Sequence, residues 1–434
     1  DKIKALRLFA VCRANFCIFR PKERNPMKRL FRRLSPARIL ALGFAGLILL
    51  GSLLLSLPCC VRPGVQVSYL DILYTAVSAV CVTGLVVVDV ADTFTALGQG
   101  LVGLLIPIGG LGVATGGAGV ILMMGKKVSQ QERTLIREAM NLDSGKGVIR
   151  FIKSVFFTTL IFEGLGTALS YPVFARNYPP LRALGVSLFH AVASFNNAGF
   201  DILGSMQNLI PYRDDVLLNL VTCLLIFFGG IGFLVIREML EKRLRWRRFS
   251  MHTKVVLSVS LTLTAAGALL LWLTEDMSFL SALFHSVSAR TAGFSTVPLG
   301  TFSNAGLLVM MLLMVIGASP GSTGGGVKTS TFFALLAGIR ASATNTSEKA
   351  FHYALPREAF RKAAVIMLLA LGAIGGSAFL MAAMEPELPL RDILFEMASA
   401  FGTVGLSTGI TPRLSPGSKM LSMGMMFIGR LGPM

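Results

Sequence analysis

The chain has 434 residues, of which 53% are hydrophobic and only 15% are charged, with a mean hydropathy of +0.69. This apolar content exceeds what the core of a water-soluble protein needs, and it favours a membrane protein. The formal net charge of +19 would favour a nucleic-acid partner in a soluble protein. No segment has the composition of a soluble basic domain, so we expect no nucleic-acid binding.

The N-terminal tail, residues 1–37, is basic, and Met27 opens a run of basic and apolar residues that is typical of a cytoplasmic end before a membrane helix. We hypothesise that Met27 is the natural start. Six cysteines and four histidines show no CxxC pair and no ligand spacing, so we expect no metal site, disulfide framework or bound cofactor. We also expect no enzymatic activity, because no catalytic set of side chains is present.

Five apolar stretches are about 20 residues long, which is enough for each to cross the hydrocarbon core as a helix. They are residues 39–58, 100–125, 217–236, 255–273 and 363–384. Lysine and arginine gather before residue 39 and in the connections 126–153, 237–254 and 340–362. Because basic connections stay on the cytoplasmic side, these clusters are predicted to be cytoplasmic and the connections between them external.

A short segment recurs four times, each time after a long apolar stretch. The copies are 74–85 (YTAVSAVCVTGL), 189–200 (FHAVASFNNAGF), 284–294 (FHSVSARTAGF) and 395–406 (FEMASAFGTVGL). Each begins with an aromatic residue, continues through small residues and ends in a glycine that is followed by Leu or Phe. The apolar part of about 10 residues is too short to span a membrane and has the length of a re-entrant segment.

A second glycine signature follows each segment after a further 24 to 30 residues. It comprises Gly109-Gly110-Leu111-Gly112, Gly229-Gly230-Ile231-Gly232, Gly317-Ala318-Ser319-Pro320 and Gly429-Arg430-Leu431-Gly432. The order predicts four units of helix, re-entrant segment and second helix. Non-helical backbone at membrane depth must be buried or line a water-filled path, so the four segments are predicted to meet at one axis.

The glycines at the ends of the short segments suit a selectivity filter. Glycine accepts backbone angles that turn carbonyl oxygens toward an axis, where they replace the water shell of a monovalent cation. The alternative is that these glycines only let membrane helices pack closely. Packing alone does not explain four similar segments at equivalent places, so the filter hypothesis is favoured.

Together these motifs resemble the superfamily of Trk, Ktr and HKT potassium transporters, and its KtrB-type membrane subunit most closely. The resemblance covers residues 30–434 and rests on Val82-Thr83-Gly84-Leu85, Asn196-Asn197-Ala198-Gly199-Phe200, Arg290-Thr291-Ala292-Gly293-Phe294, Gly402-Thr403-Val404-Gly405-Leu406, the run 317–331 and Phe427-Ile428-Gly429-Arg430. Trk-type relatives usually carry an extra helix pair before the first unit. Here a basic tail precedes Ile39, which favours the Ktr subtype.

The resemblance implies an all-α polytopic fold with four M1-P-M2 units in pseudo-fourfold array, eight transmembrane helices and both termini in the cytoplasm. It implies a homodimer in the plasma membrane that takes up potassium, with sodium dependence and control by a cytosolic, KtrA/TrkA-like RCK nucleotide-binding ring. Met434 would fall inside the last M2 helix, so truncation is expected there. The implied filter residues are Val82, Thr83, Gly84, Asn197, Ala198, Gly199, Thr291, Ala292, Gly293, Thr403, Val404 and Gly405.

The same resemblance divides the chain after the tail into four parts. Repeat 1 is 38–125, a cytoplasmic loop with repeat 2 is 126–237, a loop with repeat 3 is 238–340, and a loop with repeat 4 is 341–434.

The run 317–331, GASPGSTGGGVKTST, interrupts an apolar helix that begins near Leu307. Glycine and proline are costly inside a helix, so the helix is predicted to break in mid-membrane. In the family the matching loop lies below the filter and acts as a gate. A static kink is one alternative; a phosphate-binding loop is another, but it lacks the GK[ST] order and a preceding strand. The expected gate residues are Gly317, Ala318, Ser319, Gly321, Gly324, Gly325, Gly326, Lys328 and Arg430.

Arg430 stands where the other repeats have Gly110, Gly230 and Ala318. A buried cation in a membrane is costly and usually functional, and the resemblance implies an electrostatic barrier below the filter. The alternative is a salt bridge that packs the helices.

Arg290 and Glu396 have two open interpretations: they pair to brace the filter, or each faces the outer vestibule. His190 and His285 occupy matched places near the start of two short segments. A structural role is favoured for both, because no relay of carboxylates or histidines crosses the membrane.

The sequence therefore favours potassium uptake through a gated, cation-selective pore. The alternative is a secondary active cation symporter with ion coupling at the membrane midplane. Such a transporter usually has ionisable groups at that depth, for which Arg430 and Lys328 are the main candidates.

Overall fold

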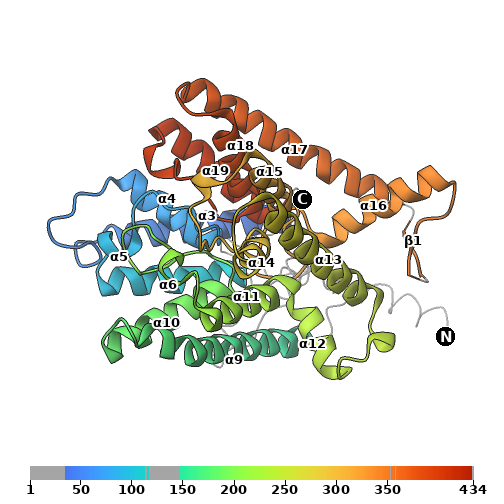
Figure 1. Ribbon diagram of the computed structural model, residues 1–434, viewed down its shortest axis with the longest axis horizontal. Coiled ribbons are helices and arrows are strands. Elements are labelled where there is room, and N and C mark those ends of the chain that lie inside the picture. The colour runs from blue at the N-terminus through green and yellow to red at the C-terminus, as the bar shows by residue number, and fades with distance from the viewer. Residues whose placement is uncertain (1–34, 113–114, 117–146, 352, 357, 433–434) are drawn as a thin grey trace, which may run out of the picture.

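The computed structural model describes residues 35–112, 115–116, 147–351, 353–356 and 358–432. Within these ranges the chain is almost entirely helical (Figure 1), with one short antiparallel strand pair, β1 (Lys349–Ala350) and β2 (Tyr353–Ala354). The hypothetical start at Met27 and most of the basic connection 126–153 lie outside the described residues.

The helices follow one another in four groups. The first is α3 (Pro36–Leu55), α4 (Tyr69–Val80), α5 (Val90–Thr93) and α6 (Ala96–Gly110). The second is α9 (Val148–Phe174), α10 (Pro180–Phe195), η1 (Ile210–Tyr212), α11 (Val216–Ile231) and α12 (Phe233–Glu241). The third is η2 (Trp246–Arg248), α13 (Met251–Thr274), α14 (Phe279–Ser288), η3 (Leu299–Thr301), α15 (Asn304–Val315) and α16 (Thr329–Thr344). The fourth is α17 (Ala359–Met384), α18 (Leu390–Gly402), η4 (Thr411–Arg413) and α19 (Pro416–Leu431).

Each group places a short helix after its long first helix. The long helices are α3, α9, α13 and α17, and the short ones are α4, α10, α14 and α18, of 10 to 16 residues. Polar residues at the junctions set where many of them begin. Ser68 and Ser278, for example, accept a backbone N–H in the first turn of α4 and α14, a contact that stabilises a helix start by about 1 kcal/mol.

Three helices of the described chain are long and apolar enough to cross a membrane: Ala37–Leu55 within α3, α13 and α17. A fourth span is obtained if α11 and α12 are counted together. The predicted total of eight spans stays a prediction.

The apolar stretch 217–236 is not one straight helix, contrary to the sequence prediction. Helix α11 ends at Ile231, and α12 leaves it at an angle of 99°. Gly232 lies between them with a φ of 92°, a left-handed conformation that glycine adopts without steric cost and that ends an α-helix. Hydropathy alone does not register this break, because every residue around it is apolar.

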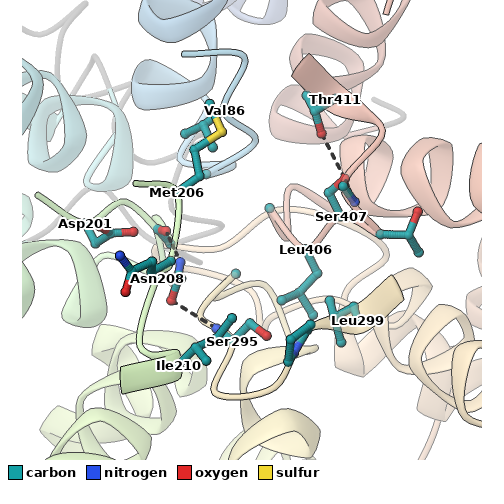
Figure 2. Close-up of a pocket in the computed structure, with 18 of the residues that line it drawn as sticks. Val86, Asp201, Met206, Asn208, Ile210, Ser295, Leu299, Leu406, Ser407 and Thr411 are labelled. Carbon is teal, nitrogen blue, oxygen red and sulfur yellow. Dashed lines mark hydrogen bonds between the residues drawn. The ribbon is translucent and has the colours of Figure 1, made fainter. Parts of the chain in front are cut away.

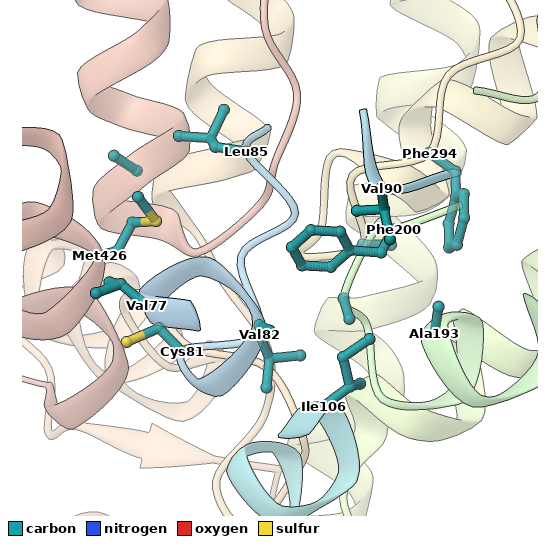
Figure 3. Packing of buried hydrophobic residues seen from close by; sticks show 14 of the residues in the cluster. Val77, Cys81, Val82, Leu85, Val90, Ile106, Ala193, Phe200, Phe294 and Met426 are labelled. Atoms are coloured by element: carbon teal, nitrogen blue, oxygen red, sulfur yellow. The ribbon is translucent and has the colours of Figure 1, made fainter. Parts of the chain in front are cut away.

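The short helices form the core, and the long helices expose apolar side chains. Residues 74–80 of α4 and 395–402 of α18 are buried throughout. Figure 3 shows side chains of α4 facing Met426 of α19, with Phe200 and Phe294 across the same core. By contrast, Leu53 of α3 is 58% exposed and Phe379 of α17 is 74% exposed. Large exposed apolar faces of this kind suit a lipid environment.

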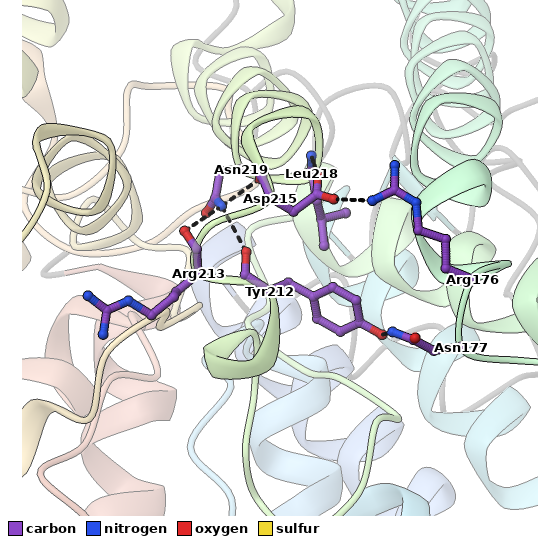
Figure 4. A network of polar contacts seen from close by, with 7 residues as sticks. All are labelled: Arg176, Asn177, Tyr212, Arg213, Asp215, Leu218 and Asn219. Carbon is purple, nitrogen blue, oxygen red and sulfur yellow. Dashed lines mark hydrogen bonds and ion pairs between the residues drawn. The ribbon is translucent and has the colours of Figure 1, made fainter.

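A buried amide secures the connection between η1 and α11 (Figure 4). The side-chain nitrogen of Asn219 lies 2.7 Å from the carbonyl oxygen of Asp215, 3.0 Å from that of Tyr212 and 3.1 Å from that of Arg213. Asn219 is only 2% exposed. At the outer edge of the same network, Arg176 forms a 3.0 Å ion pair with Asp215, and the Arg176 side chain is 65% exposed.

We expect Asn219→Ala to lower the melting temperature of the detergent-purified protein, because carbonyl groups around it lose their donor at a cost of about 1–3 kcal/mol. Arg176→Ala is the matched control and should change the free energy of unfolding by less than about 1 kcal/mol, since exposed ion pairs contribute little. Thermal unfolding of both variants measures the difference. Equal decreases of the melting temperature in both variants would show that the Asn219 amide does not stabilise the connection between η1 and α11.

Candidate functional site

Four glycines, one after each short helix, share a left-handed backbone. The φ angles of Gly84, Gly199, Gly293 and Gly405 are 89°, 66°, 82° and 95°. The residue two positions earlier is also left-handed in each case: Val82 at 56°, Asn197 at 58°, Thr291 at 75° and Thr403 at 49°. This conformation is uncommon for residues other than glycine and is worst for branched side chains. The surrounding structure therefore holds the same strained turn in four places.

The four glycines form a closed ring, which we call the glycine ring. A Cβ on Gly84 would collide with the backbone at Ala198 and Gly199, one on Gly199 with Ala292 and Gly293, one on Gly293 with Val404 and Gly405, and one on Gly405 with Thr83 and Gly84. Each turn thus abuts the next, and the fourth abuts the first. Backbones can approach this closely because glycine has no side chain.

Each turn is tied to the C-terminal end of its short helix. Backbone N–H groups of Thr83, Ala198, Ala292 and Val404 donate to the carbonyl oxygens of Ser78 (2.8 Å), Ala193 (2.8 Å), Ser288 (2.9 Å) and Ser399 (2.9 Å). In the first and fourth groups a serine hydroxyl also accepts from the ring glycine: Ser78 from Gly84 at 3.0 Å and Ser399 from Gly405 at 3.1 Å. The helix ends therefore position the ring.

A cavity of about 310 Å³ opens on one side of the ring, and we call it the vestibule. All four ring glycines line it, together with residues that follow them in the chain, among them Asp201, Ser295, Ser407 and Thr411 (Figure 2). Asn208 joins two of its walls, because its side-chain oxygen accepts from Ser295 N at 3.1 Å.

A loop lies on the other side of the ring. Helix α15 ends at Val315 and α16 begins at Thr329, so the predicted break is present as a loop at 316–328, and residues 329–331 of the predicted segment are helical instead. Gly325 N donates to the Thr403 hydroxyl at 3.0 Å, and a Cβ on Gly324 would collide with the Thr291 hydroxyl. Both threonines precede the ring glycines, whereas the vestibule residues follow them.

The 316–328 loop also reaches helices of the second and fourth groups. Ser319 N donates to Gly230 O at 2.9 Å, and the Thr323 hydroxyl donates to Gly229 O at 3.1 Å. On the opposite side Gly326 N donates to Gly429 O at 3.3 Å. The loop is therefore held from two sides across the space next to the ring.

Arg430 connects this loop to the first group. Its guanidinium donates to the carbonyl oxygens of Thr323, Gly109 and Gly110, the last at 2.7 Å. Its contacts are backbone carbonyls, and it has no carboxylate partner among the ion pairs of the described residues. Among the described residues the contacts therefore favour a role other than a helix-packing salt bridge. The amine of Lys328 donates to Gly324 O at 2.8 Å, within the loop itself.

Arg290 and Glu396 neither pair nor face the vestibule, so both interpretations from the sequence are wrong. Arg290 is 8% exposed and donates to the backbone and hydroxyl oxygens of Ser260, each at 3.1 Å. Glu396 is 0% exposed and accepts from the Thr411 hydroxyl at 2.5 Å. Each side chain finds a polar partner within its own group of helices.

The two histidines make structural contacts. His190 Nε2 lies 2.9 Å from the Thr222 hydroxyl and joins α10 to α11. His285 Nδ1 lies 2.8 Å from Ser281 O in its own helix. No relay of ionisable groups leads away from either side chain in these contacts.

The structure brings together all twelve predicted filter residues and joins the predicted gate residues in and around one loop. Sequence reasoning missed Thr323, which contacts Gly229 and accepts from Arg430. It also missed Asn208, which lies outside every repeated segment. Thr323 lies within the glycine-rich run, but its importance depends on which helices surround the loop.

Comparisons with known proteins agree with this architecture. The family model described as TrkH, cation transport protein, matches residues 53–434. The chain is 35% identical to Ktr system potassium uptake protein B of Bacillus subtilis (strain 168), over 93% of this chain and 92% of that protein. It is 36% identical to the potassium/sodium uptake protein NtpJ of Enterococcus hirae, over 94% and 93%.

The fold is also similar to a solved structure. The crystal structure of the potassium transporter TrkH from Vibrio parahaemolyticus superposes with a TM-score of 0.73 at 17% identity, covering 98% of this chain and 87% of that one. The ordered motifs, the helical fold and the match over most of the chain lead to one conclusion: this multi-pass membrane protein belongs to the TrkH cation transport protein family, as a KtrB-type member of the Trk, Ktr and HKT potassium transporters, and not to a family of enzymes.

Proposed function

We propose that this protein takes up potassium across the plasma membrane through a gated, cation-selective pore. The closed glycine ring is the observation that carries the proposal, because a ring of backbone groups around one axis is how a filter replaces the hydration shell of a monovalent cation. The four filter segments are 82–84, 197–199, 291–293 and 403–405. The Bacillus subtilis and Enterococcus hirae relatives are named as potassium and potassium/sodium uptake proteins, which supports potassium as the transported ion.

The 316–328 loop and Arg430 form the gate in this proposal. The loop is held between the second and fourth groups next to the filter, so an ion that leaves the filter meets it. Arg430 and Lys328 add positive charge at the same place, and a cation there is repelled strongly because the surroundings screen charge weakly. Opening requires the loop to move and its carbonyl contacts with Arg430 to break.

The remaining parts of the proposal concern assembly. We propose a homodimer with one pore in each protomer, both termini in the cytoplasm, sodium dependence, and control by a cytosolic RCK ring. Two relatives are named as parts of a Ktr system, and a system implies a partner subunit. The sodium dependence is supported by the name of the Enterococcus hirae relative.

Uptake of radioactive Rb⁺ into liposomes that contain the protein tests the proposal. We expect uptake that excess K⁺ blocks and excess Na⁺ does not block. Equal block by both ions would contradict potassium selectivity. Uptake that stops when the Na⁺ gradient is removed, with a fixed ratio of the two ions, would instead support the symporter alternative. Adding the cytosolic ring subunit is expected to increase the rate.

Deletion of residues 324–326 is expected to raise Rb⁺ uptake in the absence of the cytosolic partner and to abolish the response to it. The deletion removes Gly325, whose N–H binds Thr403, and Gly326, whose N–H binds Gly429. Flux is compared with that of the intact chain at equal protein density in the liposomes. Unchanged flux and unchanged regulation in a folded variant would show that the loop is a static kink.

A further inference from the structure

Glu396 stands out when the four short helices are compared position by position. In the aligned segments it occupies the place of Thr75, His190 and His285. Those three neutral side chains each have a hydrogen-bond partner: Asp71 O at 2.9 Å, the Thr222 hydroxyl at 2.9 Å and Ser281 O at 2.8 Å. The fourth group therefore carries a carboxyl group where the other three carry neutral side chains.

The carboxyl group of Glu396 is incompletely paired. Glu396 is 0% exposed, and one of its oxygens, Oε1, accepts from the Thr411 hydroxyl at 2.5 Å. The other oxygen, Oε2, is buried without a hydrogen-bond partner. Within the described chain no lysine, arginine or histidine forms an ion pair with it. Asp392, one turn earlier on α18, adds negative charge to its surroundings.

A further hydroxyl group lies next to the hydrogen bond between Glu396 and Thr411. The Ser407 hydroxyl oxygen is 2.9 Å from that of Thr411, and Figure 2 shows the two side chains facing one another at the edge of the vestibule. The Thr411 hydroxyl has one proton and gives it to a single acceptor. The Ser407 oxygen also accepts from Gly409 N at 3.0 Å, which uses one of its two lone pairs. A remaining lone pair on each hydroxyl oxygen and those on Oε2 can bind a positively charged ligand.

A buried carboxylate without a charged partner raises the free energy of the folded protein, and either a proton or a cation can neutralise it. A proton would remove the charge but would leave Oε2 without a partner. A cation would satisfy both the charge and the open oxygen. Glu396 is the one carboxylate among the three proposed ligands, so a monovalent ion balances the charge of the ligands, whereas a divalent ion would leave them with excess positive charge. Carboxylate and hydroxyl oxygens are hard ligands, and closely spaced oxygens favour the smaller of two cations.

We propose that Glu396, Ser407 and Thr411 bind a monovalent cation, Na⁺ in preference to K⁺, in the wall of the vestibule. The site is reached from the vestibule, which Ser407 and Thr411 line. Glu396 lies in α18 before Gly405, and Ser407 and Thr411 lie in the segment after it, so a bound cation joins the two sides of the fourth turn of the glycine ring and stabilises it. The inference rests on the proposed cation uptake and assigns its sodium dependence to residues of this chain.

Thermal unfolding of the purified full chain tests the site without measuring transport. The melting temperature is recorded in NaCl, KCl and choline chloride at equal ionic strength and constant pH. We expect Na⁺ to raise it at lower concentration than K⁺ does in the unchanged protein. Glu396→Gln should remove the preference for Na⁺, and Ser407→Ala should raise the half-maximal Na⁺ concentration by about tenfold, the equivalent of one weakened ligand. Glu387→Gln, an exposed carboxyl group before the same helix, is the matched control and should behave like the unchanged protein.

Several results would overturn the site. One is a rise of the melting temperature with Na⁺ that is the same in Glu396→Gln as in the unchanged protein. Another is a melting temperature of the unchanged protein that depends on pH and not on Na⁺, which would mean that a proton neutralises the carboxyl group. If Glu396→Gln does not fold, Ser407→Ala and the isosteric Thr411→Val decide the question, because both keep the charge and remove one oxygen ligand. A Na⁺ effect on stability without any Rb⁺ uptake would leave the site standing and count against the proposed transport.

Discussion

Gly293→Ala is expected to reduce Rb⁺ uptake by at least about tenfold, equivalent to about 1.4 kcal/mol in a rate-limiting step, and to narrow the difference between K⁺ and Na⁺ as competitors. Gly293 has a φ of 82°, which disfavours a side chain. The added Cβ would also collide with the carbonyl oxygen of Val404. Because the four turns abut one another, the displaced fourth turn disturbs the whole ring. Competition of K⁺ and Na⁺ against Rb⁺ in the same liposomes measures both effects.

Gly64→Ala is the matched control for this variant. Gly64 has a φ of 84° and no atoms within 4 Å of the added Cβ, so the substitution imposes the same backbone strain without a collision. We expect its uptake and selectivity to remain those of the unchanged protein. If both variants lose uptake equally, backbone strain alone explains the effect and the contact between turns does not determine selectivity.

Arg430→Ala is expected to raise Rb⁺ uptake several-fold without the cytosolic partner. The substitution removes a charge from the proposed ion path. It also frees three carbonyl oxygens, those of Thr323, Gly109 and Gly110, that now hold the 316–328 loop against the first group. Arg430→Lys should give an intermediate rate, because lysine keeps the charge but lacks the planar fork that binds several carbonyls at once.

Two results distinguish an electrostatic barrier at Arg430 from a purely structural role of this residue. A folded Arg430→Ala protein with unchanged uptake would contradict the barrier. Loss of folded protein, seen as aggregation in gel filtration, would show that the carbonyl contacts mainly stabilise the helix ends. In that case Arg430→Lys still tests the charge, since it retains a cation at the same place.

Local sequence patterns predicted the repeated parts of the molecule well. Helices α4, α10, α14 and α18 end inside the four predicted segments, and the glycine near the end of each segment has the same left-handed backbone. These features depend on residue types at fixed spacing within each segment. They could therefore be predicted without knowledge of the neighbouring segments.

Features that depend on contacts between the four groups of helices were harder to predict from the sequence. The alternatives left open for Arg290 and Glu396 were both wrong, because each side chain hydrogen-bonds to a hydroxyl residue that no motif marks, Ser260 and Thr411. The bend at Gly232 was missed since the residues next to it on both sides, Ile231 and Phe233, are apolar and hydropathy does not report backbone angles. Thr323 was overlooked because its partners come from the second and fourth groups.

The sequence by itself determined that the chain is a membrane protein with four related short segments, that each of these segments turns at a glycine, and that the apolar helix beginning near Leu307 is interrupted. Composition, hydropathy and the preference of glycine for left-handed backbone are properties of single segments, so they can be inferred from residues in order. Only the tertiary structure decided that the four turns close into a ring, that the 316–328 loop lies against it and that Arg430 binds carbonyls instead of a carboxylate. The turns of the ring and the contacts of Thr323 join residues more than 90 positions apart, and the loop reaches Thr403, 78 positions beyond Gly325. Residues at such separations meet only once the helices have packed.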